Sequence, residues 1–111
     1  MKKLFQGNDH YLLYRVFDRD DCKIQYDVSS LSDVCFTLSS KDKQTRIATL
    51  HLGSRVSLQD GTHIAVKLDR ALTADLVGEY YAQLDIYDAN GDKATIYQGS
   101  LFFQPTIDCG V

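Results

Sequence analysis

Long hydrophobic runs, tryptophan and proline are scarce in this 111-residue sequence, which has no Trp, one Pro and no apolar run longer than residues 11–14. A membrane span needs roughly 20 apolar residues, so none is expected. A secretory signal is not expected either, because polar residues 6–10 stand where its apolar stretch belongs. With 44% hydrophobic residues, the sequence predicts one soluble globular domain over 1–111, made in the cytoplasm.

Basic residues are fewer than acidic ones, and they form no cluster. The net charge is −3, so nucleic acid is not an expected partner. Glutamate is almost absent, since Glu79 is the only Glu among fifteen acidic residues. Aspartate competes with the helical backbone and collects in turns and caps. The imbalance therefore favours an all-β chain.

Cysteine is limited to Cys22, Cys35 and Cys109, an odd number without the CxxC spacing of zinc or redox sites. We expect all three to be unpaired and to act as small hydrophobic side chains. The predicted fold therefore has no disulfide.

Short runs of aromatic and branched residues between turn formers predict strands. The clearest is 34–38, where alternation with period two places Val34, Phe36 and Leu38 on one buried face. Further strands are expected at 11–17, at 22–26 after a turn at 18–21, and at 46–52 before Gly53.

Side-chain parity sets the register of a hairpin between 56–58 and 64–68, because a slip of one residue would reverse its faces. Val56 and Leu58 must share a face with Ile64. A three-residue loop at 59–61, with Gly61 left-handed, satisfies this parity and pairs Val56 with Ile64.

Asn90-Gly91 is a strong signal for a hairpin with a two-residue type I′ turn, which pairs Ala89 with Asp92. This register directs alternate residues of both strands to the core, as the pairs Tyr80 with Leu101, Ala82 with Gly99, Leu84 with Tyr97 and Ile86 with Thr95. The outer face then carries Tyr81, Gln83, Asp85 and Tyr87 beside Ala94, Ile96, Gln98 and Ser100.

Only residues 72–77 suggest a helical turn, with Thr73 as its cap and Gly78 as its end. About eight short strands separated by turns predict an antiparallel β-sandwich or a small barrel.

No arrangement of residues indicates catalysis, a cofactor or a metal site. His10, His51 and His63 fall in different elements, without a nucleophile motif such as GxSxG. Asp88, Asn90 and Asp92 resemble the start of an EF-hand loop, but Lys93 and Gly99 stand where its Gly and Glu belong. We therefore expect a protein that is not an enzyme.

A contact surface is the remaining functional feature. Tyrosine offers a large area with a polar tip, which suits interfaces, and Tyr81 and Tyr87 point away from the predicted core. The predicted interface consists of outer-face residues of the last hairpin: Tyr81, Gln83, Asp85, Tyr87, Ile96 and Gln98.

The segment Leu76-Val77-Gly78-Glu79-Tyr80 resembles the tyrosine corner of immunoglobulin-like sandwiches. The resemblance implies that the Tyr80 hydroxyl bonds to backbone a few residues upstream, near Leu76. Ala82 stands where antibody domains have their second disulfide cysteine, and the core Trp is missing, so a relative without a disulfide is implied.

The order of features from Tyr11 to Phe103 also resembles the immunoglobulin-like modules of bacteriophage virion proteins, such as the N-terminal domains of baseplate upper proteins. Shared features are an opening strand, a Ser-containing loop before 34–38, a Gly-x-Tyr strand and an Asn-Gly-Asp hairpin. The resemblance implies an accessory structural subunit of a capsid, head fibre or tail baseplate, located in the virion.

The partners that this resemblance implies are other virion proteins. The chain itself is expected as a homo-oligomer or in repeated copies of a larger assembly, and neither nucleic acid nor a membrane is an expected partner. Two alternatives stay open. One is a carbohydrate-binding or host-adhesion module that uses the same outer face, and the other is a small inhibitor of a host enzyme or defence system.

Overall fold

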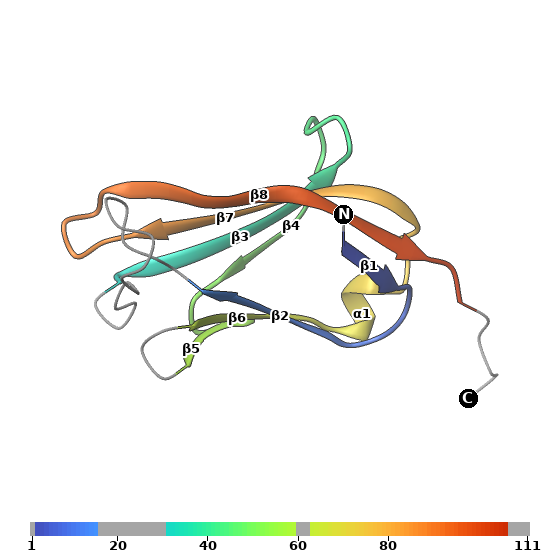
Figure 1. Ribbon diagram of the computed structural model, residues 1–111, viewed down its shortest axis with the longest axis horizontal. Helices are drawn as coiled ribbons and strands as arrows, with labels where there is room; N and C mark the ends of the chain where they lie inside the picture. Colours follow the sequence, from blue (N-terminus) through green and yellow to red (C-terminus); the bar gives the residue numbers. More distant parts are fainter. Residues whose placement is uncertain (1, 16–30, 60–62, 107–111) are drawn as a thin grey trace.

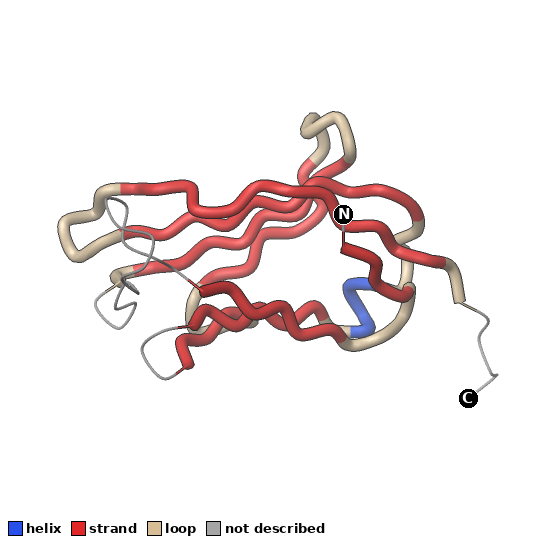
Figure 2. Tube along the Cα trace, viewed as in Figure 1, coloured by secondary structure: helices blue, strands red, loops and turns tan. Residues whose placement is uncertain are grey.

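Residues 2–15, 31–59 and 63–106 are described by the computed structural model, and they form two facing β-sheets joined at one end by a short helix (Figure 1). Figure 2 shows how far strand predominates over helix and loop. The elements in chain order are β1 (Lys2–Phe5), β2 (His10–Arg15), β3 (Asp33–Ser40), β4 (Arg46–His51), β5 (Val56–Gln59), β6 (His63–Leu68), α1 (Arg70–Thr73), β7 (Gly78–Tyr87) and β8 (Lys93–Gln104).

The strand order is that of an immunoglobulin-like sandwich. The larger sheet has the order β1-β8-β7-β3-β4 and the smaller sheet β2-β6-β5. With β2 to β8 taken as strands B, C, C′, D, E, F and G, the sheets read G-F-C-C′ and B-E-D, the immunoglobulin order with C′ added to the G-F-C sheet. The predicted all-β, immunoglobulin-like sandwich is therefore confirmed.

Strands β1, β7 and β8 depart from the expected pattern of short antiparallel strands. β1 is not among the predicted strands, and it pairs with β8 in parallel, Lys2 beside Leu101. Leu4 of β1 is buried by this pairing. β7 and β8 have 10 and 12 residues, so they are not short.

Several predictions concern residues outside the described part of the chain. The predicted strand at 11–17 is described only as far as Arg15, and the turn at 18–21 and the strand at 22–26 lie outside the described residues. Cys22 and Cys109 lie outside them as well, whereas Cys35 is described and is free.

The core lies between the two sheets, and β3 supplies its centre. Val34, Phe36 and Leu38 are completely buried, as their alternation predicts. The Tyr14 ring on β2 lies 6.5 Å from the Phe36 ring and 4.9 Å from that of Tyr97. Burial, together with the neighbouring Tyr97, raises the pKa of the Tyr14 phenol.

The β5–β6 hairpin keeps the predicted faces but not the predicted pairs. Val56 pairs with Val66 and Leu58 with Ile64, whereas the prediction paired Val56 with Ile64. A shift of two residues leaves every side chain on its face, so parity alone does not separate the two registers. The connecting residues 60–62, with Gly61, lie outside the described residues.

The β7–β8 hairpin has a three-residue turn, so the predicted two-residue turn is wrong. The Gly91 amide donates to the Asp88 carbonyl, and Gly91 has φ 86°. This geometry is a type I turn followed by a left-handed residue. Consequently Ile86 pairs with Ala94 and Asp85 with Thr95, in place of the predicted pair of Ile86 and Thr95.

A bulge at Ile96 then restores the predicted register. Beyond it Leu84 pairs with Tyr97, Ala82 with Gly99 and Tyr80 with Leu101, as predicted. The bulge inserts one residue into β8, so the side chains nearer the turn exchange faces. Ile96 therefore packs against the core, and its predicted place on the outer face is wrong.

The helix α1 begins before the predicted turn at 72–77. Its N-cap is Asp69, whose carboxylate accepts from the Leu72 amide at 2.9 Å, and not Thr73, which is the last residue of the helix. The backbone hydrogen bond from Leu72, followed by the Arg55 guanidinium, lowers the pKa of Asp69. Gly78, at φ 98°, opens β7.

Because folding lowers the pKa of Asp69, its contribution to stability is complete above the ordinary value of 3.8 and is lost as the pH falls through the lower folded value. We expect wild type to be more stable than Asp69→Asn at neutral pH, with the difference shrinking in acid. Urea midpoints of both proteins from neutral pH to about pH 2 measure this. A difference that stays constant with pH would contradict it.

Tyr80 forms the tyrosine corner that the resemblance implies. The Val77 amide donates to the Tyr80 hydroxyl at 3.3 Å, next to the expected Leu76. The Tyr80 ring packs edge-on against Phe103 at 5.7 Å. The corner thus ties the start of β7 to the preceding turn and to β8.

Removing only this hydroxyl, in Tyr80→Phe, should lower the free energy of unfolding by about 0.5–1 kcal/mol, since the ring contact is kept and one hydrogen bond is lost. Chemical denaturation against Tyr11→Phe, at a tyrosine that is 64% exposed, measures the effect. Equal midpoints for the two variants would show that the corner bond does not stabilise the fold.

Candidate functional site

The predicted side chains of β7 lie together on the outer face of the larger sheet. Tyr81, Gln83, Asp85 and Tyr87 are alternate residues of one strand and therefore share a face. The neighbouring strand β3 runs beside them and presents its own alternate residues. Their partners on β3 are, in order, Ser39, Thr37, Cys35 and Asp33.

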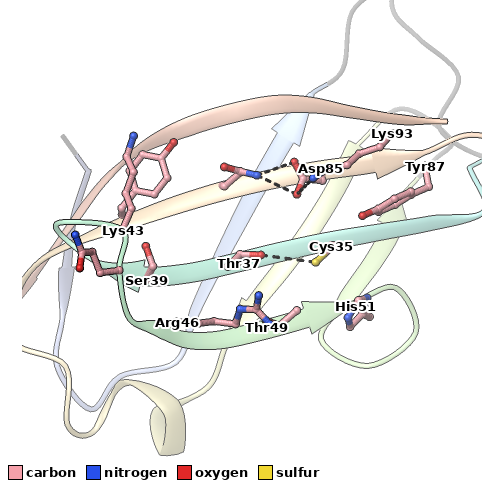
Figure 3. Close-up of a pocket in the computed structure, with 13 residues that line it drawn as sticks. Cys35, Thr37, Ser39, Lys43, Arg46, Thr49, His51, Asp85, Tyr87 and Lys93 are labelled. Carbon is pink, nitrogen blue, oxygen red and sulfur yellow. Dashed lines mark hydrogen bonds and ion pairs between the residues drawn. The ribbon is translucent and has the colours of Figure 1, made fainter.

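These side chains line a groove of about 540 Å³ on this face (Figure 3). The β3–β4 hairpin rises from the larger sheet, on the side away from the smaller sheet (Figure 1). The groove is thus open to solvent between this hairpin and the β7–β8 turn. Besides the four residues of β7, its lining consists of Cys35, Thr37 and Ser39 on β3, Lys43 and Gln44 in the hairpin loop, Arg46, Thr49 and His51 on β4, and Lys93 on β8.

Asp85 forms the buried polar centre of the groove and is only 4% exposed. Gln83 Nε2 donates to both of its carboxylate oxygens, at 3.0 and 3.1 Å, and Thr95 Oγ1 donates to Oδ1 at 2.6 Å. Lys93 Nζ lies 3.8 Å from Oδ2. A buried carboxylate is tolerated only when paired in this way, so these residues form one unit.

Of the two predicted interface residues on β8, one joins this unit. Gln98 Nε2 donates to Gln83 Oε1 at 3.3 Å and extends the polar row across the sheet. Ile96 does not, because the bulge turns it to the core. Thr95, predicted to face the core, takes its place on the outer face beside Asp85.

The end of the groove near the β7–β8 turn carries a contact between a histidine and a carboxylate. His51 Nδ1 lies 3.3 Å from Asp33 Oδ2, and both side chains are partly exposed. Ser32 Oγ donates to the Tyr87 carbonyl at 3.2 Å, which fixes the backbone beside the Tyr87 ring. Lys93 and His51, the basic side chains at this end, therefore each lie near a carboxylate.

The opposite end is formed by Lys43, the one described non-glycine residue with positive φ, at 65°. The turn is held by the Lys43 amide, which donates to the Ser40 carbonyl at 2.9 Å, and by Asp42, which accepts from the Ser40 hydroxyl and the Gln44 amide. These two bonds, the hydroxyl first, lower the pKa of Asp42. The turn places Lys43 Nζ 4.2 Å from the centre of the Tyr81 ring.

Two hydroxyl groups in the groove lining have no hydrogen-bond partner, although both are shielded from solvent. They are Tyr81 Oη and Thr49 Oγ1. Buried polar atoms are nearly always paired, and each unpaired one costs free energy. Both hydroxyls are therefore candidates for pairing with a bound group.

The residues contributed by β3, β4 and the hairpin were missed by the sequence prediction, which considered only the last hairpin. The alternation of β3 already places Cys35 and Thr37 opposite its buried residues, so that signal was present. The contributions of Arg46 and Thr49 could not be found in this way, because they depend on the long-range pairing of β3 with both β4 and β7.

The strained backbone at Lys43 makes a testable contribution. In Lys43→Gly, relief of the left-handed penalty, about 1 kcal/mol, should offset the lost cation–π contact of similar size, so stability changes little. Lys43→Val loses the contact and keeps the strain, and should be less stable than the glycine variant by about 1–2 kcal/mol. Urea unfolding of the two variants measures this difference. Equal stability of Lys43→Gly and Lys43→Val would contradict the left-handed turn.

Within residues 2–15, 31–59 and 63–106, no three His, Cys, Asp or Glu side chains gather as a possible metal site. In the same residues no helix is long and apolar enough to cross a membrane. The groove lining consists of hydrogen-bonding, charged and aromatic side chains.

The strand order and this groove define an immunoglobulin-like β-sandwich with a polar, tyrosine-lined groove on its larger sheet. No protein-family model and no curated protein matches the chain. Among solved structures, the V domain of amphioxus IgVJ-C2 is similar, with 15% sequence identity and a TM-score of 0.33, over 92% of this chain and 98% of that chain.

Proposed function

We propose that this chain is a binding module that acts by protein–protein contact through the grooved outer face of its larger sheet, and that it serves as an accessory structural subunit of a bacteriophage virion. We propose no catalytic role for any residue of the groove. Other virion proteins, or repeated copies of the chain itself, are the proposed partners.

The observation that carries the contact is the placement of Tyr81 and Tyr87 on one groove that crosses four strands, β8, β7, β3 and β4. Both rings are half-buried, so each still offers area to a partner. Interface centres are enriched in tyrosine and low in unpaired charge. The paired state of Asp85 fits this pattern, because its charge is already balanced within the chain.

The virion setting is supported by the sequence resemblance to phage immunoglobulin-like modules. Such a module acts by presenting sheet faces and edges to its neighbours. A groove on a β-sheet, with its central carboxylate already paired, is suited to repeated contacts of this kind.

Carbohydrate binding through the same face is less well supported. A sugar needs free hydrogen-bonding groups, and the Asp85 carboxylate is occupied by Gln83, Thr95 and Lys93. Gln83 is itself engaged at both ends of its amide, with Asp85 and Gln98. The polar centre of the groove around Asp85 therefore has few hydrogen-bonding atoms left for a glycan.

The test is incorporation of variants into the assembled particle. Copies of the chain per purified particle are counted for wild type, for Tyr81→Ser with Tyr87→Ser, and for Tyr11→Ser on the opposite sheet. We expect the copy number per particle to fall by about tenfold or more for the double variant, and to stay at the wild-type level for the Tyr11 variant. Thermal melting confirms that each variant is folded, and normal incorporation of the folded double variant would overturn the proposal.

A further inference from the structure

The unbalanced charges of the groove are positive, although the chain as a whole carries −3. Lys93 lies near Asp85 and His51 near Asp33. In the described part of the chain, Lys43 and Arg46 have no carboxylate partner. Both belong to the end of the groove formed by the β3–β4 hairpin (Figure 3).

Lys43 is held in place without being neutralised. Its ammonium group lies over the Tyr81 ring at 4.2 Å, and a ring face attracts a cation but does not balance its charge. Its left-handed backbone, φ 65°, is a conformation that favours glycine, so a lysine at this position comes at a cost in backbone energy. Such an outlier at a groove points to a function of the side chain.

One unpaired hydroxyl lies at this end of the groove and the other lies further along it. Tyr81 Oη belongs to the ring beneath Lys43, whereas Thr49 Oγ1 is on β4 opposite Thr37, toward the middle of the groove. Hydroxyl, ammonium and guanidinium groups can all donate hydrogen bonds. Three donors without an acceptor thus line one end of the groove, and a fourth follows it.

We infer that this end of the groove receives a carboxylate-bearing segment of the partner protein, a loop or strand rich in Asp and Glu. Carboxylates accept hydrogen bonds from both cations, and charge-assisted bonds are the stronger kind. The inference rests on the proposed function of this face as a protein contact, and it adds the chemistry of the partner.

Amide NMR of the labelled full chain tests the inference with a short blocked peptide of alternating Glu and Ser. The matched control peptide has Gln in place of Glu, and inorganic phosphate is titrated separately. We expect the Glu peptide to shift the amides of residues 40–49 and 81, and its binding to weaken as salt rises from about 0.05 to about 0.5 M.

Two variants locate the effect. The double variant Lys43→Gln with Arg46→Gln should bind the Glu peptide about fivefold or more weakly than wild type does. Lys67→Gln should not, although Lys67 also lies over a tyrosine ring, that of Tyr11 at 5.7 Å on the smaller sheet. Equal binding of the Gln peptide, equal shifts with phosphate, or an unchanged double variant would each overturn the inference.

The inference and the proposed function can fail separately. If the virion partner covers Tyr81 and Tyr87 but the Lys43 and Arg46 variant is incorporated normally, the acidic segment is wrong and the contact face stands. If nothing in the particle covers the two tyrosines, the contact face itself is wrong.

Discussion

Replacing Phe36 with alanine is expected to lower the free energy of unfolding by about 3–5 kcal/mol. Phe36 is completely buried at the centre of β3, with its ring near Tyr14 of the facing sheet. The substitution removes apolar contacts and leaves a cavity between sheets that cannot close fully. Since small domains are stable by only about 5–15 kcal/mol, the variant should be close to unfolding.

Urea unfolding of Phe36→Ala and of Tyr11→Ala makes the comparison. Tyr11 is 64% exposed on the outer face of the smaller sheet, so its loss should change stability by about 0.5 kcal/mol or less. If both substitutions destabilised the protein equally, the core would not lie between the sheets as described.

Replacing Asp85 with alanine is expected to cost about 2–3 kcal/mol, unusual for a position on the outer face of a sheet. Asp85 is 4% exposed and accepts from Gln83 and Thr95. Without it, these donors lose a charged acceptor, and Lys93 loses its nearby carboxylate. The same change at Asp75, an exposed residue, serves as the control and should be nearly neutral.

A double-mutant cycle with Thr95→Val separates the direct bond from general disturbance. The 2.6 Å bond from Thr95 predicts that the two substitutions are not additive, with a coupling of about 1 kcal/mol or more. Additive effects would show that Asp85 and Thr95 do not act together.

Local patterns in the sequence predicted the parts of the fold that depend on neighbouring residues. Alternation in β3 correctly identified Val34, Phe36 and Leu38 as core. The short Gly-x-Tyr segment correctly indicated the tyrosine corner at Tyr80. In both cases the determining residues lie within a few positions of one another.

Features that depend on distant pairing could not be predicted. β1 is a strand because β8, about a hundred residues later, lies beside it. The bulge at Ile96 compensates for the extra residue in the turn at Gly91, and neither leaves a mark in the hydrophobic pattern. A two-residue shift in the β5–β6 hairpin preserves every face and is therefore invisible to parity.

The candidate site divides in the same way. The alternation of β7 correctly placed Tyr81, Gln83, Asp85 and Tyr87 on one outer face. Lys43 and Arg46 reach that face only because β4 pairs with β3, and β3 pairs with β7. The basic end of the groove is thus a product of the fold.

The central claim is that the grooved face of the larger sheet is a contact with another protein. A structure of the assembled particle tests it most directly, through the exposure of Tyr81 and Tyr87. We predict that both rings lose their remaining exposure against a neighbouring chain, while Tyr11 stays in solvent. If both rings remain exposed in the particle and a soluble glycan perturbs their NMR signals instead, the contact is contradicted and adhesion replaces it.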